Sequence, residues 1–230
     1  MDGELIRMFF DYLPLMYTAA LMTLGLAVTS LFVGFILSII FVMLETSRWR
    51  TLNKLTAIFV SLLRGLPEIL VVFLIYFGLP EVLEKITGDY IELSAFSAGV
   101  IALSLIFSAY ASQSLRGAIK AIPNGQWESG AALGLSRGYT FTHIILPQVW
   151  RHALPGLSNQ WLVLLKDTAL VSLIGVNDLT HQAQLINTNT HQPFTWFTFT
   201  ALVYLAITLI SQVLIRKLEL HFTRFERASN

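Results

Sequence analysis

Four ionisable side chains lie inside, or at the edge of, long apolar runs of this sequence. Arg64 and Glu68 flank the stretch Gly65-Leu66-Pro67, and Lys166 and Asp167 are adjacent within another apolar run. A charged side chain in the hydrocarbon core of a membrane costs about 3 kcal/mol on insertion scales, so it usually faces a cavity or a partner helix. Carboxylates in such a place can bind a cation along a translocation path. These four residues are therefore the first candidates for function.

Glu68 has two further interpretations that do not involve a ligand. Proline lacks a backbone N–H and glycine lowers helix propensity, so we expect a helix to end or begin between Gly65 and Pro67. A helix that starts near Pro67 carries Glu68 in its first turn, where the helix dipole favours a carboxylate. Alternatively, Arg64 pairs with Glu68 at i,i+4. Arg64 itself is better placed to extend to the membrane surface than to hold a substrate.

A polar stripe surrounds the second charged pair. Asn159 lies seven residues before Lys166, and Gln160 lies seven residues before Asp167, so each of these pairs shares a helix face. The stripe indicates either a translocation path or polar contacts that hold neighbouring spans together. We favour the path for Asp167 and a structural ion pair, with Glu68 as the partner, for Lys166.

The chain lacks the motifs of several enzyme classes. It has no G-x-x-x-x-G-K-[ST] to bind ATP phosphates, no H-E-x-x-H and no G-x-S-x-G. The absence of Cys excludes thiolate metal sites, and the five His residues are not spaced as metal ligands within a span. A net charge of +1 gives no basis for a nucleic-acid partner. We expect no metal, no bound cofactor and no catalysis by this chain.

Membrane spans are the elements that must position these residues. Hydrophobic residues make up 55% of the chain and charged residues 13%, about half the charged share of a soluble domain. The mean hydropathy is +0.66. Because a span needs about 20 apolar residues, we predict an all-α membrane protein with one transmembrane domain over residues 1–230. Five runs meet or approach this length: residues 15–44, 69–79 (preceded by the interrupted stretch 55–63), 96–115, 154–176 and 194–215.

The distribution of Lys and Arg predicts which connections face the cytoplasm, where loops are rich in basic residues. When alternate segments are placed in the cytoplasm, the basic residues on that side are Arg48, Arg50, Lys54, Arg116, Lys120, Arg137, Arg151, Arg216, Lys217, Arg224 and Arg227. The opposite side keeps only Arg7 and Lys85. Five transmembrane helices with an outer N-terminus and a cytoplasmic C-terminus fit this alternation, and four or six would break it. The acidic start and the long first run argue against a cleaved signal peptide.

The longest cytoplasmic connection, residues 117–152, is too long for an idle loop. Asn124 can cap a short helix there, and Glu128 would fall near the positive end of that helix. The helix is thin because of its small residues Gly130, Ala131, Ala132 and Gly134. A thin cytoplasmic helix fits a groove on another protein. The alternative is a helix that lies on the membrane surface.

This loop carries a resemblance to a known family. Its residues Glu128-Ser129-Gly130, Gly134 and Ile144-Ile145-Leu146-Pro147 resemble the EAA motif, E-A-A-x3-G-x9-I-x-L-P, of ABC-importer permease subunits. Every spacing is kept. Ser129 and Gly130 replace the two alanines of the motif, and both are small enough for the fit into a groove to survive.

Three further stretches are similar to permeases for polar amino acids, so that the resemblance covers nearly the whole chain: residues 64–67 with 74–80, residues 116–126, and residues 166–176. The resemblance implies a type I ABC importer permease fold in the bacterial inner membrane. It also implies a heterodimer with a second permease subunit, a dimer of ATP-binding subunits and a periplasmic amino acid-binding protein. ATP and Mg would belong to the ATPase subunits. The implied substrate is a cationic amino acid, L-arginine first, with lysine, histidine, ornithine or glutamine as alternatives.

The resemblance assigns expected roles to two groups of residues. The residues expected to couple this chain to the ATPase are Glu128, Gly130, Ala131, Gly134, Ile144, Leu146 and Pro147. The residues expected to line the substrate path are Glu68, Asp167, Gln113, Asn159, Gln160 and Thr168. Glu68 replaces an apolar residue of many family members, and Gln113 replaces a Glu. An added carboxylate at Glu68 would favour a cation, and a guanidinium suits bidentate pairing. A channel or scaffold without an ATPase is the remaining alternative of another class.

Overall fold

The computed structural model describes residues 2–222, and side chains from residue 10 to residue 220. All regular elements of this part are helical. The α-helices are α1 (Asp2–Glu45), α2 (Arg50–Gly65), α3 (Glu68–Phe73), α4 (Leu79–Thr87), α5 (Ala95–Ala121), α6 (Asn124–Ala132), α7 (Arg137–Thr140), α8 (Leu146–Asp167), α9 (Leu179–Thr190) and α10 (Pro193–Phe222). Two π-helices, η1 (Leu74–Gly78) and η2 (Phe141–Ile145), and one 3-10 helix, η3 (Thr168–Ile174), complete the set.

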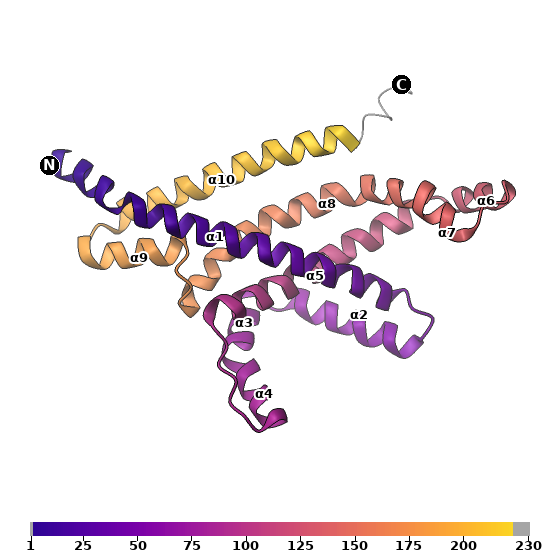
Figure 1. Ribbon diagram of the computed structural model, residues 1–230, viewed down its shortest axis with the longest axis horizontal. Helices are drawn as coiled ribbons and strands as arrows, with labels where there is room; N and C mark the ends of the chain where they lie inside the picture. The colour runs from indigo at the N-terminus through magenta and orange to yellow at the C-terminus, as the bar shows by residue number, and fades with distance from the viewer. Residues whose placement is uncertain (1, 223–230) are drawn as a thin grey trace.

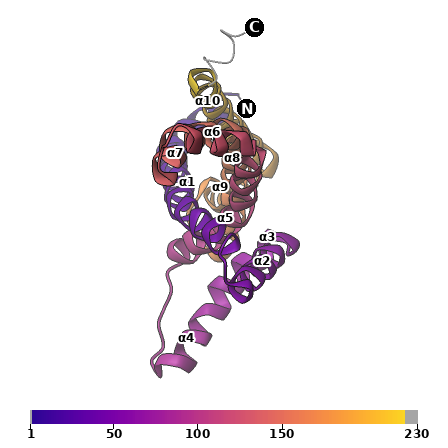
Figure 2. The same ribbon diagram turned by 90° about the vertical axis from the view of Figure 1, so that its right-hand side faces the viewer.

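Helices α1, α5 and α8 pack lengthwise and form the centre of the bundle (Figures 1 and 2). Small residues let α1 and α5 approach closely. A Cβ atom added at Gly34 of α1 would lie only 2.9 Å from the backbone oxygen of Ser104 in α5. Close backbone approach through small residues is typical of helices packed within a membrane, where apolar burial alone does not drive association.

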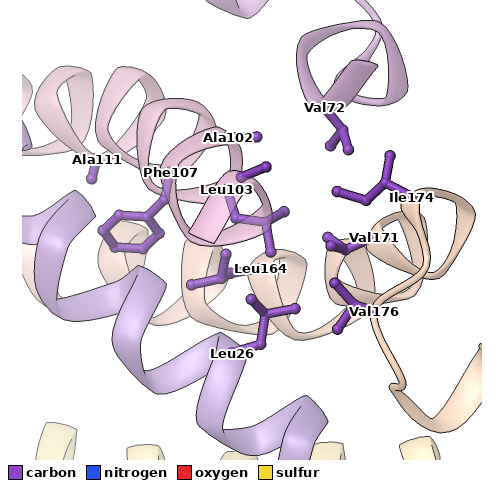
Figure 3. Close-up of a cluster of buried hydrophobic side chains, with 11 residues drawn as sticks. Leu26, Val72, Ala102, Leu103, Phe107, Ala111, Leu164, Val171, Ile174 and Val176 are labelled. Carbon is purple, nitrogen blue, oxygen red and sulfur yellow. The ribbon is translucent and has the colours of Figure 1, made fainter. Parts of the chain in front are cut away.

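The main apolar core lies where these three helices meet α3 and η3 (Figure 3). Leu26 of α1, Leu103 of α5 and Leu164 of α8 are at most 3% exposed there. Val72 of α3 and Val171 of η3 close the cluster and are fully buried. The core therefore fixes the beginning of α3 and the end of α8 against the same three helices.

The chain turns sharply between α2 and α3, by 112°. Leu66 and Pro67 are extended at this turn, which confirms the predicted helix break between Gly65 and Pro67. Beyond it, α3, η1 and α4 continue to Thr87, and α4 projects away from the bundle in both views (Figures 1 and 2). The stretch 55–63, predicted only as an interrupted apolar segment, belongs to a separate helix, α2.

The fourth apolar run differs from its prediction as a helix over residues 154–176. Helix α8 begins at Leu146, with Pro147 in its first turn, where a missing N–H has no cost. The α-helix ends at Asp167 and tightens into η3, which stops before Gly175 in a left-handed conformation, φ 90°. The connection between α5 and α8 is thus residues 122–145 rather than the predicted 117–152.

Three helical segments of the described part are long and apolar enough to cross a membrane: Phe10–Glu45, Ala95–Ala121 and Pro193–Leu220. The bent pair α2 and α3–α4 would add a fourth if it forms one span, and α8 is not among the qualifying helices. The α1–α2 connection, α6, α7 and the end of α10 gather toward one end of the bundle, while α9 lies toward the other (Figure 1). Arg224 and Arg227, which the charge pattern uses, lie outside the described residues.

Candidate functional site

The predicted coupling loop forms a short helix, α6, at one end of the bundle (Figure 2). Pro123 occupies the position before its first residue, and no side chain caps it, so the prediction of Asn124 as the cap is wrong by one position. Trp127, its single large apolar residue, packs inward against a buried cluster of α1, α5 and α8. A helix without a continuous apolar face is a poor match for the membrane-surface alternative.

Two glycines of the EAA-like motif have specific structural roles. Gly130 is buried against Thr140, and a Cβ at position 130 would lie 2.6 Å from the Thr140 hydroxyl oxygen. Glycine instead of the motif's alanine therefore matches the threonine opposite it. Gly134 has φ +71°, the left-handed conformation that favours glycine, and makes a close turn after the helix. The Leu135 N–H bonds back to the Gly130 oxygen at 3.0 Å across this turn.

Glu128 lies in the second turn of α6, so the prediction that it sits at the positive end of the helix is wrong. Its exposed side chain and Ala131 instead line a cavity of about 720 Å³ with Arg137 of α7. Apolar side chains surround this end of the molecule, since Leu133 is 75% exposed and Tyr139 is 50% exposed. Exposed apolar residues around a charged cavity are typical of a protein–protein contact surface.

The second half of the motif connects the loop to α8. The Ser136 hydroxyl accepts the Tyr139 N–H and caps α7, and the π-helix η2 follows. Ile144 lies half-buried in η2, and Leu146 and Pro147 form the first turn of α8. These residues fix the direction in which α8 leaves the loop.

The two predicted path carboxylates lie in one region. Glu68 is the first residue of α3, and Asp167 is the last residue of α8. α3 packs against η3, directly after Asp167. Glu68 and Asp167 are both half-buried, and they interact electrostatically with each other. Two carboxylates in a partly desolvated place repel each other and create a negative potential that a cation relieves.

Neither of the structural ion pairs considered for Glu68 is formed in the described part of the chain. The Arg64 guanidinium lies over the Tyr110 ring, 5.4 Å from its centre, and the Tyr110 hydroxyl donates to the Arg64 backbone oxygen at 3.4 Å. Lys166 is exposed at the end of α8 and interacts electrostatically with Asp167, its neighbour in sequence. The predicted Lys166–Glu68 pair is therefore wrong, which leaves the Glu68 carboxylate available.

The other predicted path residues lie in different surroundings. Asn159 is exposed and Gln160 half-buried on α8. Thr168 is fully buried, and its hydroxyl donates to the Leu165 backbone oxygen at 2.7 Å and lies 3.4 Å from the Tyr204 hydroxyl. A substrate contact through Thr168 finds no support in this geometry. Within the described residues, no three His, Asp or Glu side chains are grouped to hold a metal ion.

Gln113 lies in a polar group that sequence reasoning missed. Its amide nitrogen donates to both carboxylate oxygens of Glu45, at 3.1 and 3.2 Å. Arg116 donates to the same carboxylate at 2.6 Å. Glu45 is 2% exposed. We call Glu45, Gln113 and Arg116 the Glu45 cluster.

A second buried carboxylate, Asp178, was also missed. One of its oxygens accepts the His181 N–H at 2.9 Å and caps α9, and the other accepts the Tyr204 hydroxyl at 3.3 Å. Thr23 of α1 accepts the Leu179 N–H beside it. Burial raises the pKa of the Asp178 carboxyl, and the hydrogen bonds oppose that shift only in part. We call Asp178, its capping partner His181 and Tyr204 the Asp178 cluster.

A family model described as "Binding-protein-dependent transport system inner membrane component" matches residues 34–224. The chain belongs to this family. The match includes α5, the coupling loop, α8 and both path carboxylates. The chain is therefore a component of a transport system, as the EAA-like motif predicted.

Relatives and a solved structure agree with this assignment. The chain is 73% identical to the arginine ABC transporter permease protein ArtQ of Haemophilus influenzae, with 96% of this chain and 99% of the relative covered. It is 51% identical to the ArtQ protein of Escherichia coli strain K12, with 94% and 98% covered. The crystal structure of an amino acid ABC transporter with histidines matches with a TM-score of 0.82 and 30% identity over 92% of this chain and 95% of that chain. The predicted all-α permease fold is confirmed.

Proposed function

We propose that this chain is the permease subunit of an ATP-driven importer for cationic amino acids, with L-arginine as the principal substrate. The observation that carries the proposal is the meeting of Glu68 and Asp167 at the break between α2 and α3. A guanidinium can pair with a carboxylate through two parallel hydrogen bonds. The names of the relatives support arginine over other cations.

The proposal includes five transmembrane helices: α1, the bent unit of α2 with α3–α4, α5, α8 with η3, and α10. Their N-terminal end is periplasmic and their C-terminal end cytoplasmic, in the bacterial inner membrane. α8 crosses despite its polar residues because its path side is shielded from lipid by neighbouring helices. The grouping of α6, α7 and the α1–α2 connection at one end of the bundle supports this sidedness.

The subunit acts with partners in this proposal. A second permease subunit forms a heterodimer with it, two ATP-binding subunits dock on the coupling loops, and a periplasmic binding protein delivers the amino acid. ATP and Mg bind the ATPase subunits, because this chain has no phosphate-binding loop. The exposed apolar residues around Glu128 supply the docking surface.

The geometry suggests how movement reaches the path. Closure of the ATPase dimer displaces α6, which is held to the bundle by Trp127 and by a 3.4 Å bond from Gln148 to Gln126. The displacement rocks α5 and α8, and the end of α8 carries Asp167. The space between Asp167 and Glu68 then opens to one side of the membrane at a time.

A selectivity measurement tests the role of the two carboxylates. In proteoliposomes that hold the complete transporter, Glu68→Gln and Asp167→Asn should each raise the arginine concentration for half-maximal uptake about tenfold, because each removes a charge-assisted bond. Competition by glutamine should improve relative to lysine. Glu84→Gln, an exposed carboxylate of α4, is the matched control and should change neither value. Unchanged arginine uptake and competition in both variants would refute the assignment.

The coupling role of α6 has a separate test. Gly134→Leu places a side chain at φ +71°, a conformation that a leucine adopts only with strain. Membrane insertion should persist while arginine uptake is abolished. Normal uptake and normal stimulation of ATP hydrolysis by this variant would contradict the proposed role. Purification of the native chain without any ATP-binding subunit would favour the channel or scaffold alternative.

A further inference from the structure

The Glu45 cluster places a carboxylate inside the bundle with a full set of partners. The Glu45 side chain is 1% exposed, and its counter-ion Arg116 is 32% exposed. Arg116 bonds to one carboxylate oxygen at 2.6 Å, and Gln113 bonds to both. A second ion pair, Glu81–Lys85, is highly exposed on α4. The Glu45 cluster thus contains a charge pair that the surrounding packing holds in one geometry.

The cluster joins three elements close to the coupling helix. Glu45 is the last residue of α1, and Asn53 of α2 donates to its backbone oxygen. Helix α5 carries Gln113 and Arg116 and ends at Ala121. Only two residues lie between this end and the start of α6 at Asn124. A movement of α6 therefore passes into α5 over a very short connection. The bonds from Arg116 and Gln113 to Glu45 are polar contacts that hold the end of α1 against α5.

An apolar cluster packs neighbouring turns of the same helices. A buried cluster of Val42, Leu115, Ala118, Ile122, Ile145, Val149 and Ala153 joins α1, α5, η2 and α8, and Trp127 of α6 packs against it. Apolar contacts of this kind are non-directional and tolerate sliding between helices. A charged pair with three hydrogen bonds fixes the relative position of two helices far more narrowly.

A buried ion pair usually contributes little net stability compared with an apolar pair of the same size, because desolvation offsets the attraction. Fixing the relative position of two helices explains a charge pair at this place better than a gain in stability does. We propose that Glu45, held by Arg116 and Gln113, is a positioning residue that transmits the displacement of α6 and α5 to α1 during transport. This inference rests on the proposed function. Glu45 touches neither substrate nor ATPase in this account.

The test is the number of arginine molecules imported for each ATP hydrolysed, measured with the complete transporter in proteoliposomes. Glu45→Gln keeps the size of the side chain and removes its charge, and Arg116 is exposed enough to reach water. We expect the ratio to fall at least about fivefold. The arginine concentration for half-maximal uptake should stay within about twofold, since the path is unchanged. The matched control, Glu81→Gln, removes the exposed ion pair and should leave the ratio as in the native transporter.

A purely structural role would lower the yield of assembled transporter and leave the ratio of the remaining transporter unchanged, which would overturn the inference. If Glu45→Gln fails to assemble, Glu45→Asp decides the question. It keeps the charge but shortens the reach to Arg116, so a reduced ratio supports the inference and an unchanged ratio overturns it. Absence of ATP-dependent uptake by the native transporter would instead refute the proposed function, and the inference with it.

Discussion

Two buried carboxylates lie toward opposite ends of this bundle, and they are held in different ways. Glu45 is 2% exposed and has a cationic partner, Arg116, beside the amide of Gln113. Asp178 is 0% exposed and accepts from neutral donors, among them the His181 N–H and the Tyr204 hydroxyl. Both side chains join helices that are distant in sequence. Only the first is compensated by a full charge.

The difference shows how burial and charge compensation combine. A carboxylate beside a guanidinium stays ionised in a poorly hydrated place, whereas one held by neutral dipoles is driven toward its protonated form. The Glu45 cluster should therefore respond mainly to loss of its partner. The Asp178 cluster should respond mainly to pH.

Arg116→Met should have the largest effect on stability, because it leaves the Glu45 carboxylate buried without a counter-ion. We expect a loss of about 3–5 kcal/mol in the free energy of unfolding, measured by denaturant titration of the purified transporter in detergent. The double variant Glu45→Gln, Arg116→Met removes both charges and should recover most of that loss. Equal stability of the single and the double variant would contradict the account of the Glu45 cluster.

Asp178→Ala should lower the free energy of unfolding by a smaller amount, about 1–2 kcal/mol, because it removes an N-terminal cap of α9 but leaves no buried charge. Asp178→Asn keeps an oxygen that accepts the His181 N–H and carries no charge, so at neutral pH it should be at least as stable as the native chain. The same denaturant titration measures both. A larger loss for Asn than for Ala would show that the Asp178 charge itself stabilises the fold.

The pH dependence of stability should separate the two clusters further. The folded-state pKa of Asp178 is raised above its ordinary value of 3.8, so the folded chain binds this proton more tightly than the unfolded chain. The contribution of Asp178 to stability is therefore largest at or below pH 3.8 and declines as the pH rises through the raised pKa. Melting temperatures of the native chain and of Asp178→Asn across this window should show a steeper decline in the native chain. A native chain that gains stability relative to Asp178→Asn as the pH rises would contradict the assignment.

Tyr204→Phe should have the smallest effect of the series. It removes the 3.3 Å bond to Asp178 and the 3.4 Å contact with Thr168 but keeps the ring in the core. A loss of about 1 kcal/mol is expected at neutral pH. Without this donor the Asp178 charge is less well satisfied, so the pH-dependent decline should extend to higher pH. An unchanged pH profile would mean that Tyr204 contributes packing alone.

The coupling loop was largely predictable from the sequence because its chemistry is local. The positive φ of Gly134 and the short helix before it follow from residue types and spacings within a few turns. The start of the helix was misjudged by one residue, which placed Glu128 incorrectly relative to the helix dipole. The break near Pro67 was predicted for the same local reason.

The polar clusters were not predictable because their partners come from distant segments. Gln113 was assigned to the path, yet its partner Glu45 is 68 residues away and depends on the register between α1 and α5. Asp178 accepts from Tyr204 of α10, 26 residues further along the chain. The change from α-helix to 3-10 helix after Asp167 also has no local signal before Gly175.

The most direct test of the central claim is uptake of labelled arginine into proteoliposomes. They should contain this chain, a second permease subunit, the ATP-binding subunits and the periplasmic binding protein. Unlabelled lysine, histidine, glutamine and glutamate serve as competitors. We predict uptake that requires ATP and is inhibited by the cationic competitors alone. Uptake that glutamine or glutamate inhibits equally would contradict the proposed selectivity of the Glu68–Asp167 region.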